Sequence, residues 1–259
     1  MGDENPIQRK GGKLGWLTEL DVAHRGLHLP GTAREENSLA AISAAVEKGY
    51  AVLVDIRSTL DGVAVAFHDA TLDRMTEKKG KLADYSYRQL EDVTVGWSQE
   101  NIPSLTDVLD VVEGQVPVFL QIKTDGVADI VPICAGIRRA LEGYKGKIAV
   151  MSFDFRIVSW FKRYLPTCGR GVMLGRDMIL SMRNRIALNF KLNGLSPDFV
   201  AFDVNLMPNP FAEKLRKKGM PIFVWTVRHV DMESIARRFS DRLIFEEPAV
   251  TGVISDPSQ

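Results

Sequence analysis

Two histidines, each at the end of a short apolar run, are the residues of this chain best placed to do chemistry. His24 lies in the segment VAHRG and is followed by Arg25, and His68 lies in the segment VAFHD and is followed by Asp69. An imidazole gives or takes a proton near neutral pH, and an arginine beside it binds an anion. The pattern therefore indicates acid–base chemistry on an anion, with a phosphoester as the first candidate.

The elements that position these histidines follow from the alternation of short apolar runs with amphipathic runs of helix length. Strands are predicted at 20–24, 51–56, 63–67, 116–122, 147–151, 171–174, 199–202 and 221–227, with a last strand at either 242–245 or 252–255. Helices are predicted at 38–48, 104–112, 127–141, 155–164, 209–218 and 232–239, among others. Such alternation predicts parallel strands with helical crossovers, and its length favours an α/β fold of the TIM (β/α)8 barrel type over a doubly wound sheet.

The stretch at about 70–103 is too long and too polar for an ordinary connection, so it is predicted to be a small inserted subdomain in a single barrel domain spanning 1–259. Ser38 and Ser104 precede predicted helices and are expected to cap them. Asp61-Gly62 is a strong turn pair and is expected to form a tight turn or hairpin. In a barrel, polar residues that follow different strands meet at one mouth, so His24 and His68 are expected to converge.

Composition excludes several classes of function. The chain has 259 residues with 33 basic and 33 acidic side chains, so it gives no reason to expect nucleic acid or an anionic membrane as partner. No Gly-rich nucleotide loop follows a predicted strand. Cys134 and Cys168 lack metal-ligand spacing and are predicted to be buried free thiols. Without a signal-like or membrane-spanning apolar run, we expect a cytoplasmic protein with no stable membrane insertion.

Several short motifs occur together in chain order. They are HRG at 24–26, ENS at 36–38, Asp55, DG at 61–62, HD at 68–69, QIK at 121–123 and WTV at 225–227. This series resembles the glycerophosphodiester phosphodiesterase family, from about residue 22 to near the C-terminus. The resemblance implies a TIM barrel with a small insertion after the second histidine. It also implies a phosphoric diester hydrolase whose partner is a small molecule with a glycerophosphodiester-like headgroup.

The resemblance also assigns roles to individual residues. His24 and His68 match the general acid and base, and Arg25 matches a residue that grips a non-bridging phosphate oxygen. The resemblance places Lys123 near the phosphate, Trp225 near the glycerol, and Glu36 and Asn37 at the mouth or just behind it.

The metal ligands are where this chain departs from the resemblance. The family has Glu-x-Asp on its second strand and Glu-x-Lys on a later one, and these three carboxylates bind a divalent cation. Here the corresponding residues are Leu53, Asp55 and Gln121. Asp55 and Gln121 therefore remain as weak candidate ligands for Mg²⁺ or Ca²⁺, which prefer carboxylates. Strand alternation turns Leu53 and Asp55 to one face, so weak or altered metal dependence is expected.

Cleavage without a metal is chemically feasible, since two histidines can break a phosphodiester when a neighbouring hydroxyl of the substrate attacks phosphorus. Such acid–base help is worth roughly 10²–10⁴-fold. The charge stabilisation of a lost cation would be replaced in part by Arg25, Lys123 or Arg57, and Asp55 could instead pair with Arg57 or Lys123. Two alternatives stay open: a catalytically silent phosphate-binding homologue, and a related enzyme that transfers or cyclises phosphodiesters. No feature of the sequence specifies an oligomeric state.

Overall fold

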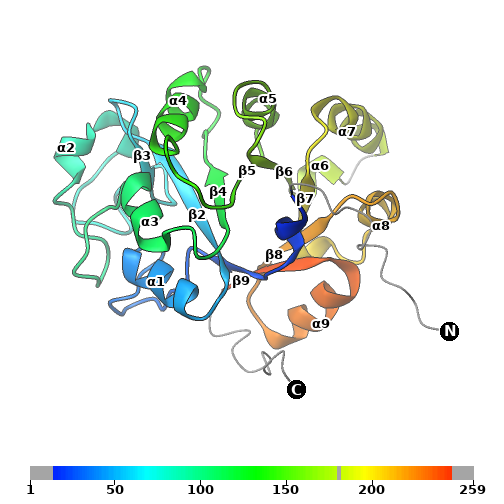
Figure 1. The fold of residues 1–259 in the computed structure, drawn as a ribbon, viewed down its shortest axis with the longest axis horizontal. Helices are drawn as coiled ribbons and strands as arrows, with labels where there is room; N and C mark the ends of the chain where they lie inside the picture. The colour runs from blue at the N-terminus through cyan, green and yellow to red at the C-terminus, as the bar shows by residue number, and fades with distance from the viewer. Residues whose placement is uncertain (1–13, 180–181, 247–259) are drawn as a thin grey trace.

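Strand β1 (Val22–His24) is hydrogen-bonded on both sides, to β2 (Ala51–Ser58) and to β9 (Arg242–Phe245), and this double pairing closes the sheet into a barrel. The computed structural model describes residues 14–179 and 182–246. Within these ranges, eight parallel strands form the barrel (Figure 1), the others being β4 (Val118–Ile122), β5 (Ile148–Ser152), β6 (Gly169–Leu174), β7 (Phe199–Asp203) and β8 (Ile222–Val227). The predicted TIM barrel is confirmed.

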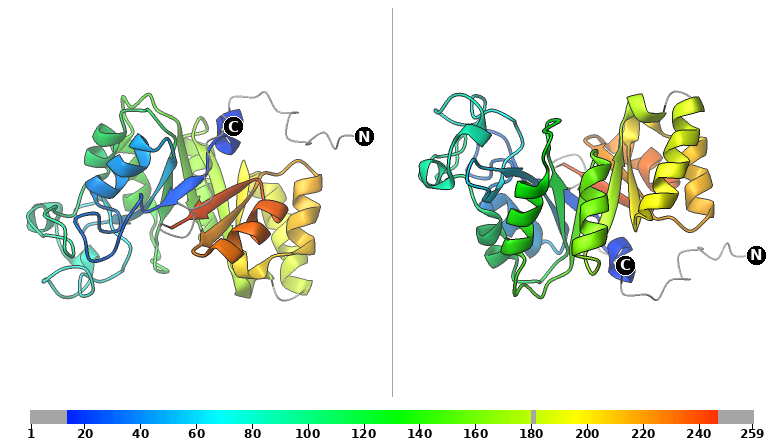
Figure 2. Two further views of the ribbon diagram at one scale, coloured as in Figure 1. Left: turned by 90° about the horizontal axis from the view of Figure 1, so that it is seen from below. Right: turned by 90° about the horizontal axis from the view of Figure 1, so that it is seen from above.

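Helices surround the barrel on the outside, as Figures 1 and 2 show. In chain order they are α1 (Leu39–Glu47), α3 (Leu105–Val112), α4 (Val131–Ala140), α5 (Phe155–Tyr164), α6 (Arg176–Ile179), α7 (Met182–Leu195), α8 (Pro210–Lys217) and α9 (Val230–Phe239). As predicted, Ser38 caps α1 by accepting from the Ala41 amide at 3.1 Å, and Ser104 caps α3. No helix in the described part of the chain combines the length and the apolar character needed to cross a bilayer.

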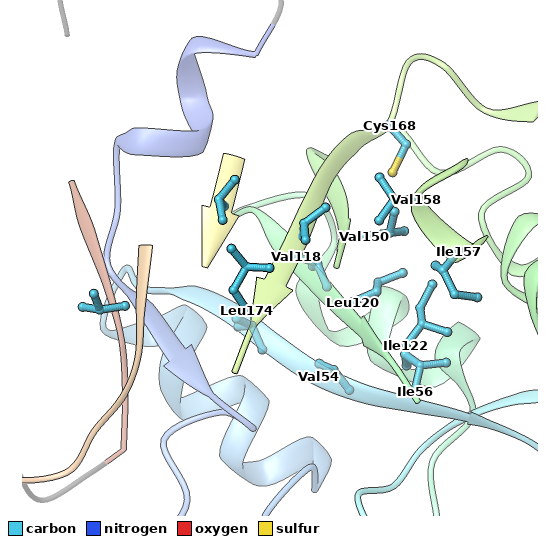
Figure 3. Close-up of a cluster of buried hydrophobic side chains, with 14 of the residues drawn as sticks. Val54, Ile56, Val118, Leu120, Ile122, Val150, Ile157, Val158, Cys168 and Leu174 are labelled. Atoms are coloured by element: carbon cyan, nitrogen blue, oxygen red, sulfur yellow. The ribbon is translucent and has the colours of Figure 1, made fainter. Parts of the chain in front are cut away.

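The strands bury both of their faces, and the period-two alternation of side chains divides the core into two parts. Side chains such as Val54, Leu120 and Val150 point outward to the helices (Figure 3). Those of Leu53 and Phe119 belong to the cluster inside the barrel. Cys134 and Cys168 are both buried free thiols of the outer cluster, as predicted.

A short 3₁₀ turn at Gly15–Thr18 precedes β1 and packs against the interior cluster. Leu17 is buried in this cluster, and the Trp16 ring meets the edge of the Phe119 ring at 6.0 Å. The turn precedes the amino end of β1, opposite the end where His24 lies. It therefore fills the floor of the barrel and leaves the carboxyl ends of the strands as the open side.

The strand predicted at 63–67 is present, but it is not a barrel strand. It forms β3 (Ala64–Ala66), which pairs antiparallel with β2 through the hairpin that Asp61-Gly62 was predicted to make. The last place in the barrel belongs to β9, at one of the two predicted positions. The other position, 252–255, lies outside the described residues.

The segment 70–103 contains α2 (Tyr87–Leu90) and packs around a small cluster of its own beside β3, at one edge of Figure 1. Helix α7 was not among the predicted helices. Its buried Leu188 and Leu192 alternate with the exposed Ile186 and Phe190, so the sequence shows no single apolar face.

Candidate active site

The barrel brings the predicted site residues of four strands to its open side. His24 is the last residue of β1, where it is in register with Leu53, and Asp55 lies farther along β2 in register with Gln121 of β4. Lys123 directly follows β4, and the backbone of Phe67, just before His68, is hydrogen-bonded to that of Asp55. Parallel strands with helical crossovers therefore bring His24, Asp55 and Lys123 to one mouth, and the antiparallel hairpin strand β3 returns the chain to the same place just before His68.

Asp55 is the centre of this cluster and is completely buried. Its Oδ1 lies 3.0 Å from Lys123 Nζ, and its Oδ2 lies 2.9 Å from Arg25 Nε. Asn37 holds the same residue from the other side, because its Oδ1 accepts from the Asp55 amide at 3.0 Å. Although burial acts to raise it, the pKa of Asp55 is well below its usual value because the charges of Lys123 and Arg25 stabilise the carboxylate.

The HRG segment turns sharply to place Arg25. Arg25 has a φ of +61° and Gly26 one of +77°, both in the left-handed region. A Cβ on Gly26 would lie 2.5 Å from the backbone of Ala41, so only glycine lets the chain pass helix α1 this closely. Arg25 then donates from Nη1 to Glu36 Oε2 at 2.9 Å and reaches Asp55 with Nε. Two carboxylates thus contact the guanidinium, Glu36 at Nη1 and Asp55 at Nε.

His24 is held by an acidic residue that follows the last strand of the barrel. Its Nδ1 lies 2.7 Å from Glu246 Oε1, and Arg228 donates to the other oxygen of Glu246 at 2.7 Å. Burial lowers the pKa of His24 below its usual 6.5, and the hydrogen bond to Glu246 opposes that shift without reversing it. The contact makes Nδ1 the natural site of the ring proton in neutral His24, leaving Nε2 for proton transfer.

His68 is arranged in the same way but is more open to solvent. Its Nδ1 lies 2.6 Å from Asp69 Oδ1, and its side chain is 32% exposed. Burial again lowers the pKa of the ring, against the opposing charge of Asp55. Arg57 donates from Nε to the His68 carbonyl at 2.8 Å, and its guanidinium pairs with Asp125. Of the two pairings left open for Asp55, the structure shows the one with Lys123, and Arg57 instead holds the backbone of His68.

Glu246 and Arg74 are among the residues in contact with the site that the sequence analysis did not identify. Glu246 carried a usable signal, because it directly follows β9 and so occupies the kind of position that drew attention to His24. Arg74 carried none, since it lies inside the segment 70–103 with no strand beside it. Arg74 bonds to both Glu36 and Asp69.

Trp225, which the resemblance placed near the glycerol, forms an apolar wall with one other aromatic residue. Its ring meets the edge of Phe153, which follows β5, at 5.3 Å and 82°. Its indole N–H donates to the Ala201 carbonyl at 3.2 Å, so Trp225 offers a surface rather than a donor. Glu36 and Asn37 lie behind the site, where they hold Arg25 and Asp55.

The residues present do not fit the carboxylate metal site that the resemblance implies. Leu53 is fully buried in the interior cluster. With its amide oriented to satisfy both neighbours, Gln121 donates to Asp55 Oδ1 at 3.2 Å and accepts from Lys123 Nζ at 3.0 Å. Both oxygens of Asp55 therefore already face cations or amide donors, and the chain has Leu53 and Gln121 at the two positions where the family motif has glutamates.

A second set of ligand-type atoms lies at the edge of the site. In the described part of the chain, Glu36, His68 and Asp69 each offer an atom, and these atoms lie within 4.8 Å of one another. The Arg74 guanidinium contacts both carboxylates of the set. The positive charge at this place is thus supplied by a side chain of the protein.

A TIM barrel that gathers two carboxylate-bound histidines, an arginine and a lysine at its open side is the architecture of a barrel-type phosphoric diester hydrolase. The chain belongs to the glycerophosphoryl diester phosphodiesterase family, whose sequence profile matches residues 24–258.

Relatives of known name agree with this membership. The chain is 27% identical over 245 residues to a glycerophosphodiester phosphodiesterase of Caldanaerobacter subterraneus subsp. tengcongensis, covering 90% of this chain and 96% of that one. A phosphodiesterase of Oleispira antarctica, solved with the product sn-glycerol-3-phosphate, has a TM-score of 0.76 at 22% identity, covering 88% of this chain and 93% of that one. A glycerophosphodiester phosphodiesterase of Thermotoga maritima has a TM-score of 0.74 at 22% identity, covering 92% and 99%. At these identities the two structures show a shared fold.

Proposed function

We propose that this protein cleaves a small glycerophosphodiester by proton transfer through His24 and His68, with Arg25 and Lys123 rather than a carboxylate-bound cation neutralising the phosphate. The observation that carries the proposal is the matched pair of histidine–carboxylate contacts, 2.7 Å at His24–Glu246 and 2.6 Å at His68–Asp69. Each contact holds one ring nitrogen and leaves the other for the substrate. The named relatives support a glycerophosphodiester as the substrate class.

The two histidines differ in burial, and this difference suggests how the roles are divided. His24 is almost completely buried, which favours its neutral form, so it serves as the base. His68 is partly open to solvent and serves as the acid. The free glycerol hydroxyl next to the phosphate attacks phosphorus while His24 takes its proton. The bond from phosphorus to the alcohol breaks, and His68 gives that oxygen a proton.

The products of this step are a cyclic glycerol phosphate and the free alcohol. The same two groups then work in reverse, because His68 takes a proton from water as the water attacks phosphorus, and His24 returns a proton to the glycerol oxygen. The sum is hydrolysis to glycerol phosphate and an alcohol. Arg25 and Lys123 stabilise the charge that develops on the phosphate oxygens.

The experiment is a ³¹P NMR time course on glycerophosphocholine, glycerophosphoethanolamine and glycerophosphoglycerol. We expect a cyclic phosphate intermediate or glycerol phosphate with the unchanged protein. His24→Gln is expected to abolish turnover of these substrates, whereas the exposed His229→Gln leaves it unchanged. Equal rates for His24→Gln and the unchanged protein would overturn the proposal.

A silent phosphate-binding barrel is the second candidate, and the burial of Leu53 in place of a ligand favours it. A silent barrel would bind glycerol phosphate in calorimetry and turn over none of the three diesters. The same time course therefore separates the two functions.

A further inference from the structure

Arg74 belongs to the segment 70–103 and connects two carboxylates of the site, those of Asp69 and Glu36. Its Nε and Nη2 donate to the two oxygens of Asp69 at 2.6 and 3.0 Å. Its Nη2 and Nη1 also donate to the two oxygens of Glu36 at 2.5 and 3.3 Å. A planar guanidinium can hold two carboxylates in fixed orientations at once, which a lysine cannot do.

Each of these carboxylates in turn holds a residue of the proposed reaction. Asp69 contacts Nδ1 of His68 at 2.6 Å, and Glu36 accepts from Arg25 at 2.9 Å. The Arg74 guanidinium therefore contacts the carboxylates that hold both His68, the proposed acid, and Arg25, a proposed phosphate-binding residue. Without it, Asp69 and Glu36 would be two like charges close together, and repulsion would move the side chains that they hold.

Arg74 also has contacts within the inserted segment to which it belongs. Its Nη1 lies 3.0 Å from the Sδ atom of Met75, a buried member of the small cluster of that segment. The Met75 carbonyl accepts from the Gly96 amide at 2.6 Å, so two distant parts of the segment meet here. Folding of the inserted segment thus determines where the guanidinium lies.

We infer that Arg74 is a positioning residue, through which the inserted segment sets the orientation of the His68 ring and of the Arg25 guanidinium. Arg74 acts through Asp69 and Glu36 and is not itself placed on the substrate. The inference rests on the proposed function, since it assigns Arg74 a part in the same reaction.

The test compares Arg74→Gln, Arg74→Lys and Arg88→Gln, a control at an exposed arginine on α2 of the same segment. Misplacement of reacting groups by about 1 Å lowers rates by roughly 10²-fold, so we expect a kcat loss of that order in Arg74→Gln. We expect Arg74→Lys to recover part of the loss, and Arg88→Gln to match the unchanged protein. Guanidinium ion added to Arg74→Gly is expected to raise kcat, whereas the same addition to the unchanged protein is not.

The outcomes separate this inference from the proposed function. If the unchanged protein is active and Arg74→Gln has the same kcat, the inference is wrong while the function stands. If Arg74→Gln does not fold, Arg74→Lys decides: a folded Lys variant with undiminished kcat also overturns the inference. If the unchanged protein turns over no diester, the proposed function fails first.

Discussion

The carboxylate of Asp55 on β2 and the ammonium of Lys123, which follows β4, lie 3.0 Å apart at the open side of the barrel. Arg25 approaches the other oxygen of the same carboxylate at 2.9 Å. In this chain Asp55 therefore organises two cationic side chains. The charges that face a phosphate in our account are fixed covalently to the protein, and a buried aspartate holds them in place.

Asp55→Asn is expected to lower the stability of the fold by about 3–5 kcal/mol, because it leaves two largely buried cations without their carboxylate. The measurement is the free energy of unfolding in urea. Asp110→Asn, at an exposed position on α3, is the matched control and should change little. An Asp55→Asn protein as stable as the control would mean that the cations are held by other groups.

The division of roles between the histidines predicts a dependence on the leaving group. An activated diester with a p-nitrophenyl leaving group needs no acid, so His68→Gln should retain much of its activity on it. On glycerophosphocholine the same variant should lose roughly 10²–10⁴-fold. His24→Gln, lacking the base, should lose activity on both. The reverse pattern would exchange the roles of the two residues.

The pH dependence follows from burial, which lowers the pKa of both His24 and His68 below 6.5. A base must be neutral, so the rate falls when the pH drops below the pKa of His24. An acid must be protonated, so the rate also falls when the pH rises above the pKa of His68. Because both shifts are downward, kcat/KM should be largest below pH 6.5. A maximum above pH 7.5 would contradict the assignment of the low-pH fall to His24 and of the high-pH fall to His68.

The two departures from the family pattern can be reversed in one variant. Leu53→Glu with Gln121→Glu places two carboxylates beside Asp55, as in the family motif. Without metal, the added charges should lower the unfolding midpoint, and Ca²⁺ or Mg²⁺ should restore it. An ion at 100 times its Kd adds about 2.7 kcal/mol. The unfolding midpoint of the unchanged protein should not shift with metal. A double variant whose midpoint also does not shift would show that the mouth cannot accept the ion.

Much of the site could be predicted because it lies on regular strands. Period-two alternation turns Asp55 to the same face as Leu53, and it does the same for Gln121 and Lys123. Their common location then follows from the parallel barrel, in which every strand ends at the same mouth.

The partners of the residues that escaped prediction are set by tertiary contacts, even where the position itself, such as that of Glu246 directly after a strand, could have drawn attention. Glu246 meets His24 only because the last strand closes on the first, at a separation of 222 residues in sequence. Arg74 meets Glu36, 38 residues away in sequence, only once the inserted segment has folded beside β3. The apolar run at 63–67 did not by itself show that β3 lies outside the barrel, although the Asp61-Gly62 turn pair pointed to the antiparallel hairpin that places it there.

The most direct test of the account is the rate of glycerophosphocholine cleavage by protein stripped of metal, with its metal content checked by mass spectrometry. Measurements in EDTA are compared with measurements in added Mg²⁺ or Ca²⁺. We predict the same kcat/KM in all three conditions, with the rate lost in His24→Gln. A rate that vanishes in EDTA and returns only with the metal would contradict the central claim that the side chains of this protein supply the charge.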